Sequence, residues 1–144
     1  MARVLLTERT LNPSGVIAEV SLKSNGALVS FVGTVRDTRD DKTVTHLVYQ
    51  CYEPLARPAI HRIVDDLQKE HPGLALAIHH RLGWVGVGEE GVVIAATSPH
   101  RKASFEAVAT AIDRIKHEVP IWKQEHYDDG SSRWREEEPI TNHD

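Results

Sequence analysis

Alternating apolar and polar positions indicate several strands along the chain. In "ALVSFVGTVR", residues 27–36, the alternation puts Phe31 and Gly33 on one face of a strand. We expect this run to pair in antiparallel fashion with "TVTHLVYQCYE", residues 43–53, across the charged loop "DTRDDK". Gly33 indicates a bulge or a close backbone approach. Three further runs have strand composition: residues 2–8, 74–83 and 91–98.

Apolar residues recur with a helical period in two longer segments. The first covers residues 54–70 and is ended by "HPG". The second starts with Ser98 as its N-cap and ends at Val119, because a residue before proline is pushed out of the α region. The buried face predicted for this second helix is Phe105, Val108, Ala109, Ile112, Ile115 and Val119. A shorter helix is expected within residues 16–26, after the breaker "NPSG" and closed by Gly26.

Strands that lie outside and between the helices, mostly with short connections, predict an α+β fold. After the second long helix, "IWKQEHY" and "SSRWREE" flank "DDG" and predict a terminal hairpin. With 144 residues the chain has the size of one domain, which we place at residues 1–144. The tail "EEEPITNHD", from about residue 136 to 144, is expected to be frayed.

Composition and charge narrow the classes of function. The chain is 40% hydrophobic with a net charge of -4, which is typical of a folded, mildly acidic domain. Nucleic acid is therefore a poor candidate as a partner, and any anion site must be built locally from a few basic residues. Cys51 is the only cysteine and cannot form an internal disulfide. No run of about 18 apolar residues and no signal-peptide pattern is present, so we expect a cytoplasmic protein that does not enter a membrane.

The stretch "IKHEVPIWKQE", residues 115–125, carries two lysines on either side of a helix break. Pro120 removes a helical hydrogen bond, so Lys123 is expected on the following strand, folded back toward Lys116. A lysine at the border of the core loses hydration and can act in proton transfer or as a nucleophile. The alternative is an ordinary lysine that complements the helix dipole and extends to water.

Three further cations are candidates for anion binding. His100 and Arg101 in "TSPHRKASF" lie in the first turn of a predicted helix, where N–H groups and side-chain donors can hold a phosphate or a carboxylate. Arg36 ends a strand before a loop and offers a guanidinium fork for a phosphate; Arg39 on that loop is a weaker candidate. Each of these residues can also be a plain solvated cation.

Cysteine and metal chemistry find less support in the sequence. Cys51 falls on the same strand face as Leu47 and Tyr49, so a packed structural cysteine is favoured over a nucleophile. His79 and His80 are adjacent on a strand and point to opposite faces, and the nine histidines form no recognised metal pattern. We expect no metal and no other cofactor.

Several motifs, taken in order, resemble the large, catalytic subunit of molybdopterin synthase, the MoaE family. They are "FVGTVR" at 31–36, "SPHR" at 98–101, "KHEVPIWKQE" at 116–125, and a glycine followed by "RW" at 133–134. The resemblance runs from about residue 3 to about residue 135. It implies an α/β hammerhead-type fold with an antiparallel sheet and two main helices.

The resemblance also implies an activity, partners and a site. A small ubiquitin-like subunit would insert a Gly-Gly thiocarboxylate tail, and two sulfurs would pass in turn to cyclic pyranopterin monophosphate to form the molybdopterin dithiolene. The large subunit would be a homodimer within a heterotetramer. Position by position, Lys116 and Lys123 match the family's active-site lysines, while Arg36, His100 and Arg101 match its anion-binding set. Arg133 or Arg135 would stand in for a further arginine that reaches the neighbouring subunit's pocket.

The sequence is also compatible with two functions other than sulfur transfer. A non-catalytic binding module of the same fold would hold a phosphorylated small molecule or a partner's carboxylate tail in the same basic pocket. A hydrolase based on Cys51 is the weaker alternative.

Overall fold

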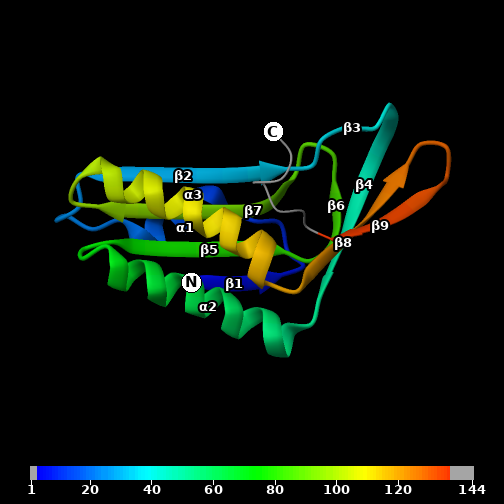
Figure 1. The fold of residues 1–144 in the computed structure, drawn as a ribbon. Coiled ribbons are helices and arrows are strands. Elements are labelled where there is room, and N and C mark those ends of the chain that lie inside the picture. Colours follow the sequence, from blue (N-terminus) through cyan, green and yellow to red (C-terminus); the bar gives the residue numbers. More distant parts are fainter. Residues whose placement is uncertain (1–2, 137–144) are drawn as a thin grey trace.

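The computed structural model describes residues 3–136 of the chain. Nine strands and three helices form within this range (Figure 1). In chain order they are β1 (Val4–Thr7), α1 (Pro13–Val20), β2 (Ala27–Thr34), β3 (Thr38–Arg39), β4 (Lys42–Cys51), α2 (Glu53–Glu70), β5 (Ala75–Arg81), β6 (Gly83–Gly86), β7 (Glu90–Ser98), α3 (Arg101–Glu118), β8 (Ile121–Tyr127) and β9 (Ser132–Glu136).

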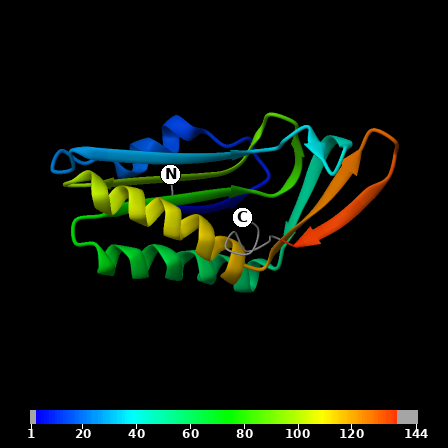
Figure 2. The ribbon, with the colours of Figure 1, turned by 45° about the horizontal axis from the view of Figure 1, so that its top comes forward.

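The first sheet has the strand order β1-β5-β7-β2 and is covered on both faces. Helices α2 and α3 pack on one face and the shorter α1 on the other (Figure 2). All seven residues of β5 are buried, because a sheet between two helical layers has no solvent face. The strands are antiparallel except for the parallel pair β1 and β5, so the predicted antiparallel sheet is a mixed one.

The second sheet stands at one end of the first (Figure 1). Its long strand β4 pairs with β8 and β6, β8 pairs with β9, and the short β3 pairs with the start of β4. One face of this sheet is apolar and closes over Val35 at the end of the first sheet. The α+β fold with two main helices and the terminal β8–β9 hairpin are confirmed.

The predicted pairing of β2 with β4 is wrong. β2 pairs with β7 instead, and β4 belongs to the second sheet. The reason lies in the charged loop, where Asp40 and Asp41 both have positive φ and form a two-residue turn. This turn reverses the chain within the loop, so β3 is the hairpin partner of β4. The four-residue β6, which follows the run predicted at 74–83, was also not predicted as a separate strand.

The start of α1 differs from the expectation as well. "NPSG" is the beginning of this helix rather than a breaker before it, because Pro13 occupies the first turn and the Asn12 side chain accepts a hydrogen bond from Gly15 N at 3.2 Å. The helix ends at Val20, well before Gly26.

The prediction of the buried face of α3 is confirmed in part: Val108, Ile115 and Val119 are buried, while Phe105 and Ala109 are exposed. Its N-cap is His100, while Ser98 ends β7, donates from its hydroxyl to the His100 carbonyl at 2.6 Å and contacts the Ser104 hydroxyl at 2.5 Å. Phe105 is 60% exposed. The buried stripe is Ser104, Ala107, Val108, Ala111 and Ile115. Small residues therefore face the sheet, and the prediction had favoured the larger apolar side chains.

The bulge predicted at Gly33 is confirmed by a register shift between Gly33 and Thr34. A Cβ atom at Gly33 would lie 2.8 Å from Val92 Cγ1, so a side chain there would have to displace its neighbour. β9 extends through Glu136, and the rest of the tail predicted to fray lies outside the described residues. The single-domain assignment for residues 1–144 stays a prediction. Within residues 3–136, none of the helices has the length and apolar character needed to cross a membrane.

Candidate active site

The end of α3 sets the position of the two lysines. Val119 follows the helix with extended backbone angles, φ -97° and ψ 124°, and its N–H closes the last turn on the Ile115 carbonyl at 3.2 Å. Pro120 cannot continue the helix, and β8 starts at the next residue. Lys116 therefore sits in the last turn of α3, while Lys123 sits on a strand that runs back along β4.

Lys116, Lys123 and Arg36 line one cavity of about 200 Å³. Lys116 and Lys123 are half-buried, and Arg36 is exposed at the rim. The rest of the wall comes from β2, β4, β5, β7 and α3: Phe31, Gly33, Thr34, Tyr49, His80, Val92, Ile112 and Ile115. Three cations around a small, partly apolar cavity favour an anion, because the low local dielectric strengthens each attraction.

Two wall residues that the sequence did not single out support this cavity. Tyr49 is paired directly with Lys123 across β4 and β8, and its ring meets the His80 ring edge-on at 5.0 Å. His80 is buried, and its Nδ1 lies 2.8 Å from the Arg81 carbonyl, which fixes the ring. Their strand positions gave no signal, because alternation alone does not tell which buried face borders a cavity.

His100 and Arg101 do not lie in this cavity. Both are exposed at the start of α3, whereas Lys116 is in its last turn. At about 1.5 Å per residue the two ends are roughly 22 Å apart along the helix axis. One copy of the chain therefore brings together three of the five predicted site residues, and the other two lie at the opposite end of α3.

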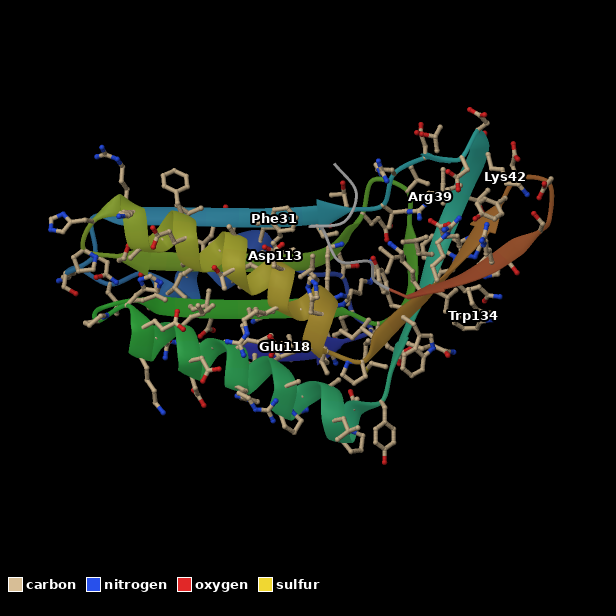
Figure 3. The ribbon with its side chains drawn as sticks, in the orientation of Figure 1. Phe31, Arg39, Lys42, Asp113, Glu118 and Trp134 are labelled. Atoms are coloured by element: carbon tan, nitrogen blue, oxygen red, sulfur yellow. The ribbon has the colours of Figure 1, made fainter. Side chains whose placement is uncertain are left out.

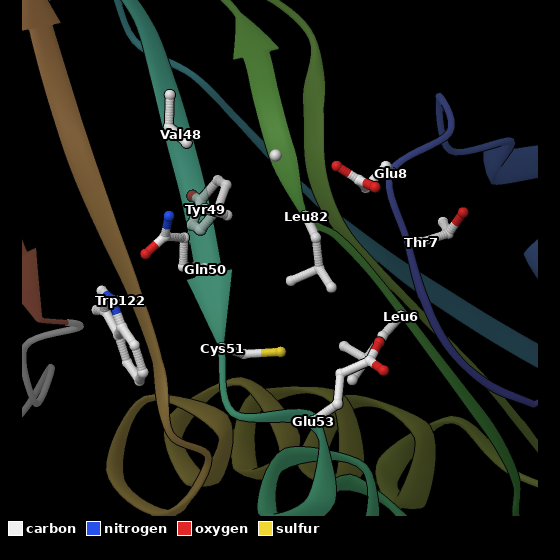
Figure 4. Close-up of a pocket in the computed structure, with 11 residues that line it drawn as sticks. Leu6, Thr7, Glu8, Val48, Tyr49, Gln50, Cys51, Glu53, Leu82 and Trp122 are labelled. Carbon is white, nitrogen blue, oxygen red and sulfur yellow. The ribbon is translucent and has the colours of Figure 1, made fainter.

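A larger cavity, of about 650 Å³, lies beside β1 and β4 (Figure 4). Its charged lining residues are Glu8 and Glu53, and no lysine or arginine lines it within the described part of the chain. Cys51 is in its wall, where burial and then the charge of Glu53 raise the pKa of the thiol. A raised thiol pKa disfavours the nucleophilic thiolate. This cavity therefore suits neither an anionic substrate nor a cysteine nucleophile.

Arg135, a candidate for reaching a neighbouring subunit, is engaged within its own sheet. Its Nε donates to Glu125 Oε1 at 2.5 Å and its guanidinium lies 3.2 Å from Asp40. Glu125 is buried and also accepts from the Tyr127 hydroxyl at 2.8 Å. Arg133 is exposed on β9. Across residues 3–136, no group of three or more His, Cys, Asp or Glu side chains is placed to hold a metal ion.

Comparison with known proteins identifies the family. The family model "MoaE protein" matches residues 6–118. The molybdopterin synthase catalytic subunit of Bacillus subtilis is 42% identical over 130 residues, 90% of this chain and 83% of that protein.

Solved structures agree with this match. Molybdopterin synthase from Staphylococcus aureus superposes with a TM-score of 0.89 at 32% identity, covering 94% of this chain and 98% of that one. A complex of subunits 1 and 2 of molybdopterin-converting factor from Helicobacter pylori shares the fold, with a TM-score of 0.78 at 24% identity and coverage of 94% and 92%. The chain belongs to the MoaE family, the catalytic subunits of molybdopterin synthase.

Proposed function

We propose that this chain transfers sulfur from the thiocarboxylated Gly-Gly tail of a small ubiquitin-like subunit to cyclic pyranopterin monophosphate, forming the dithiolene of molybdopterin. The observation that carries the proposal is the cavity lined by Arg36, Lys116 and Lys123. A tail that ends in an anion has to approach a substrate phosphate. Three cations around the cavity offset the repulsion between the two anions. We place this reaction in the cytoplasm, as the sequence led us to expect.

The chemistry needs a donor beside the acyl carbon. The tail sulfur forms a bond to a substrate carbon while a carbon–oxygen bond at that carbon breaks and the displaced oxygen takes a proton. Water then hydrolyses the resulting thioester, leaving sulfur on the substrate and a carboxylate on the tail. Each acyl step passes through an oxyanion, which positioned N–H donors stabilise. In this proposal Lys116 lies nearest the acyl carbon and stabilises the oxyanion or moves a proton, while Lys123 and Arg36 hold the substrate. The tail supplies the sulfur, so the mechanism requires neither Cys51 nor a bound cofactor.

His100 and Arg101 enter the proposal through a second copy of the chain. β2 is an edge strand of the first sheet, and exposed apolar side chains lie along it and on the start of α3. These side chains are Leu28, Phe31, Val32 and Phe105. An antiparallel two-fold arrangement along this surface would carry the start of one α3 toward the end of the other. His100 and Arg101 would then bind substrate in the partner copy's cavity, within a heterotetramer of two large and two small subunits.

The partner assignment has one further support. The Helicobacter pylori structure with the same fold is a complex of two molybdopterin-converting factor subunits. By analogy we assign the small subunit to this chain as its sulfur donor.

Replacing Lys116 tests the mechanism. Lys116→Ala should lower molybdopterin formation from thiocarboxylated small subunit and cyclic pyranopterin monophosphate by about 10²–10³-fold, the usual cost of losing one oxyanion donor. Lys69→Ala is the matched control, because Lys69 occupies the last turn of the other long helix and is exposed. Near-normal turnover by Lys116→Ala would refute the assigned role. A wild-type chain that binds the small subunit but forms no molybdopterin would instead favour the alternative of a non-catalytic module that only binds an anion.

A further inference from the structure

One imidazole belongs to the wall of the cavity of about 200 Å³ that Lys116 and Lys123 line, which we call the lysine cavity. His80 in β5 is paired directly with Val92 in β7, and Val92 is paired with Gly33 in β2. Directly paired residues share a face of a sheet, and all three line the lysine cavity. His80 therefore belongs to the side of the cavity that the first sheet forms.

Both sheets and α3 bound the lysine cavity. In Figure 3 its place is marked by Phe31 on β2, which lines it, and by Glu118 at the end of α3, two residues after Lys116. Tyr49 in β4 lines it from the second sheet, and the Tyr49 and His80 rings meet edge-on at 5.0 Å. His80 is 3% exposed, so its ring has little contact with bulk water.

The tautomer of His80 follows from its contact with the backbone. Its Nδ1 lies 2.8 Å from the Arg81 carbonyl oxygen, and a carbonyl oxygen can only accept a hydrogen bond. Nδ1 therefore carries the proton of the neutral ring, and Nε2 carries the lone pair. A ring that is oriented in this way presents a basic nitrogen in a fixed direction.

The surroundings of His80 leave it as the base of the lysine cavity. The other charged or titratable lining residues are Arg36, Tyr49, Lys116 and Lys123. No Asp or Glu side chain lines the cavity in the part of the chain from residue 3 to residue 136. The paired neighbours of His80 are Leu6 and Val92, and α2 and α3 pack on this face through apolar residues. Lysine and tyrosine keep their protons at neutral pH, whereas an imidazole is largely unprotonated there.

Hydrolysis of the thioester needs a proton acceptor. Water must lose a proton as its oxygen bonds to the carbonyl carbon, and an oxyanion forms in the same step. An ammonium group that stabilises this oxyanion has no lone pair with which to accept the proton. Lys116 cannot perform both tasks at once, so the base is a second residue.

We propose that His80 is the general base for hydrolysis of the thioester between the tail of the small subunit and the substrate. His80 Nε2 takes a proton from the water whose oxygen bonds to the carbonyl carbon, while Lys116 stabilises the oxyanion. The carbon–sulfur bond then breaks, the imidazolium returns its proton to the leaving sulfur, and the tail carboxyl group releases its proton to solvent. This inference rests on the proposed function and separates the two roles that it left to Lys116.

Single-turnover reactions with thiocarboxylated small subunit and cyclic pyranopterin monophosphate test the role of His80. The reactions are stopped with acid, and mass spectrometry of the small subunit distinguishes its thiocarboxylate, thioester and carboxylate forms. His80→Gln keeps a polar side chain but provides no base, so hydrolysis should slow by about 10²-fold or more. The thioester should therefore accumulate, while its formation stays close to the wild-type rate.

His79→Gln is the matched control. His79 is the preceding residue of β5 and is 2% exposed, but it points to the opposite face of the sheet, away from the lysine cavity. Replacing it carries the same risk to folding as replacing His80. Its thioester should be hydrolysed at close to the wild-type rate, at a temperature where thermal unfolding shows both variants to be folded.

The pH profile of the wild-type chain gives a readout without any substitution. Only an unprotonated base accepts the proton, so with His80 in this role the hydrolysis rate should rise with pH. The rise should lie in the range where imidazoles titrate, about pH 5.5–7.5, and end in a plateau. A lysine acting as the base would give a rate that keeps rising to about pH 10.

Failure of the inference and failure of the proposed function give different results. The inference is wrong, and the proposed function stands, if His80→Gln hydrolyses the thioester as fast as His79→Gln or loses activity without accumulating it. A wild-type rate that rises to about pH 10 contradicts the inference in the same way. If the wild-type chain forms neither thioester nor molybdopterin, the proposed function is wrong and the inference falls with it.

Discussion

The two sheets of this protein are built in opposite ways. The first is buried between helices on both faces, and its interior is mostly aliphatic, with buried polar residues confined to the last residues of β5 and β7. The second sheet has one apolar face with a buried carboxylate, Glu125, and one exposed face that carries the tryptophans. The cavity lined by Arg36, Lys116 and Lys123 lies where the two sheets meet, with walls from β2, β5 and β7 on one side and from β4 and β8 on the other.

This difference suggests a division of labour. Aliphatic burial is non-directional and supplies most of the free energy of folding. Polar and aromatic groups fix particular geometries instead, and they are costly to leave unpaired. We therefore expect the first sheet to set the global stability and the second to set the position of the functional groups.

The largest loss of stability is expected for a substitution in the core beside the first sheet. Ile60 in α2 is fully buried against this sheet, so Ile60→Ala should lower the free energy of unfolding by about 2–5 kcal/mol. Leu55→Ala on the same helix is the control, because Leu55 is 62% exposed and its truncation leaves no cavity. Denaturant unfolding followed by circular dichroism measures both variants. A loss below about 1 kcal/mol for Ile60→Ala would contradict the role assigned to the first sheet.

An intermediate effect is expected at Glu125 in the second sheet. Glu125→Gln keeps an acceptor for Tyr127 but removes the charge that Arg135 contacts, which should cost about 1.5–3 kcal/mol. Amide exchange should rise in β8 and β9 and stay unchanged in β5. Glu106→Gln, on the exposed side of α3, is the control. Equal acceleration in both sheets would mean that they unfold as one unit.

The smallest expected effect is the change in the free energy of unfolding with pH. Burial, and then the charge of His126, lower the pKa of His46 below its ordinary value of 6.5. The folded state therefore prefers neutral His46, and its contribution to stability is present above pH 6.5 and is lost as the pH falls through the lowered pKa. Between pH 7.5 and about pH 5, the free energy of unfolding should fall more steeply for the wild-type chain than for His46→Gln. His61→Gln, an exposed histidine of α2, should follow the wild-type curve.

The sequence predicted the elements better than their partners. Strand alternation and the Pro120 break are local signals, and they correctly gave β2, β4, the two long helices and the end of α3. The pairing of β2 with β7 depends on a contact far along the chain, which local periodicity does not encode. Phe105 shows a second limit: hydrophobicity alone put it in the core, while packing against the sheet selects the smaller Ala107 and Ala111.

The sequence predicted some residues of the candidate site and missed others. Lys116 and Lys123 could be associated because one proline sets both positions, and Arg36 was found at a strand end. Their proposed roles stay predictions. Tyr49 and His80 were not predicted to border the cavity, because they look like ordinary strand residues until β4 and β5 are placed in space. The separation of His100 from Lys116 follows from the length of α3, which the sequence did contain.

The turn between β3 and β4 has a consequence for protein engineering. Asp40 and Asp41 hold φ values of 51° and 65°, which glycine and asparagine adopt more readily than most residues. Asp40 also contacts Arg135, so its carboxylate has a structural use. Asp41→Gly is therefore the conservative substitution at this hairpin, because it relaxes the backbone and leaves the Arg135 contact in place.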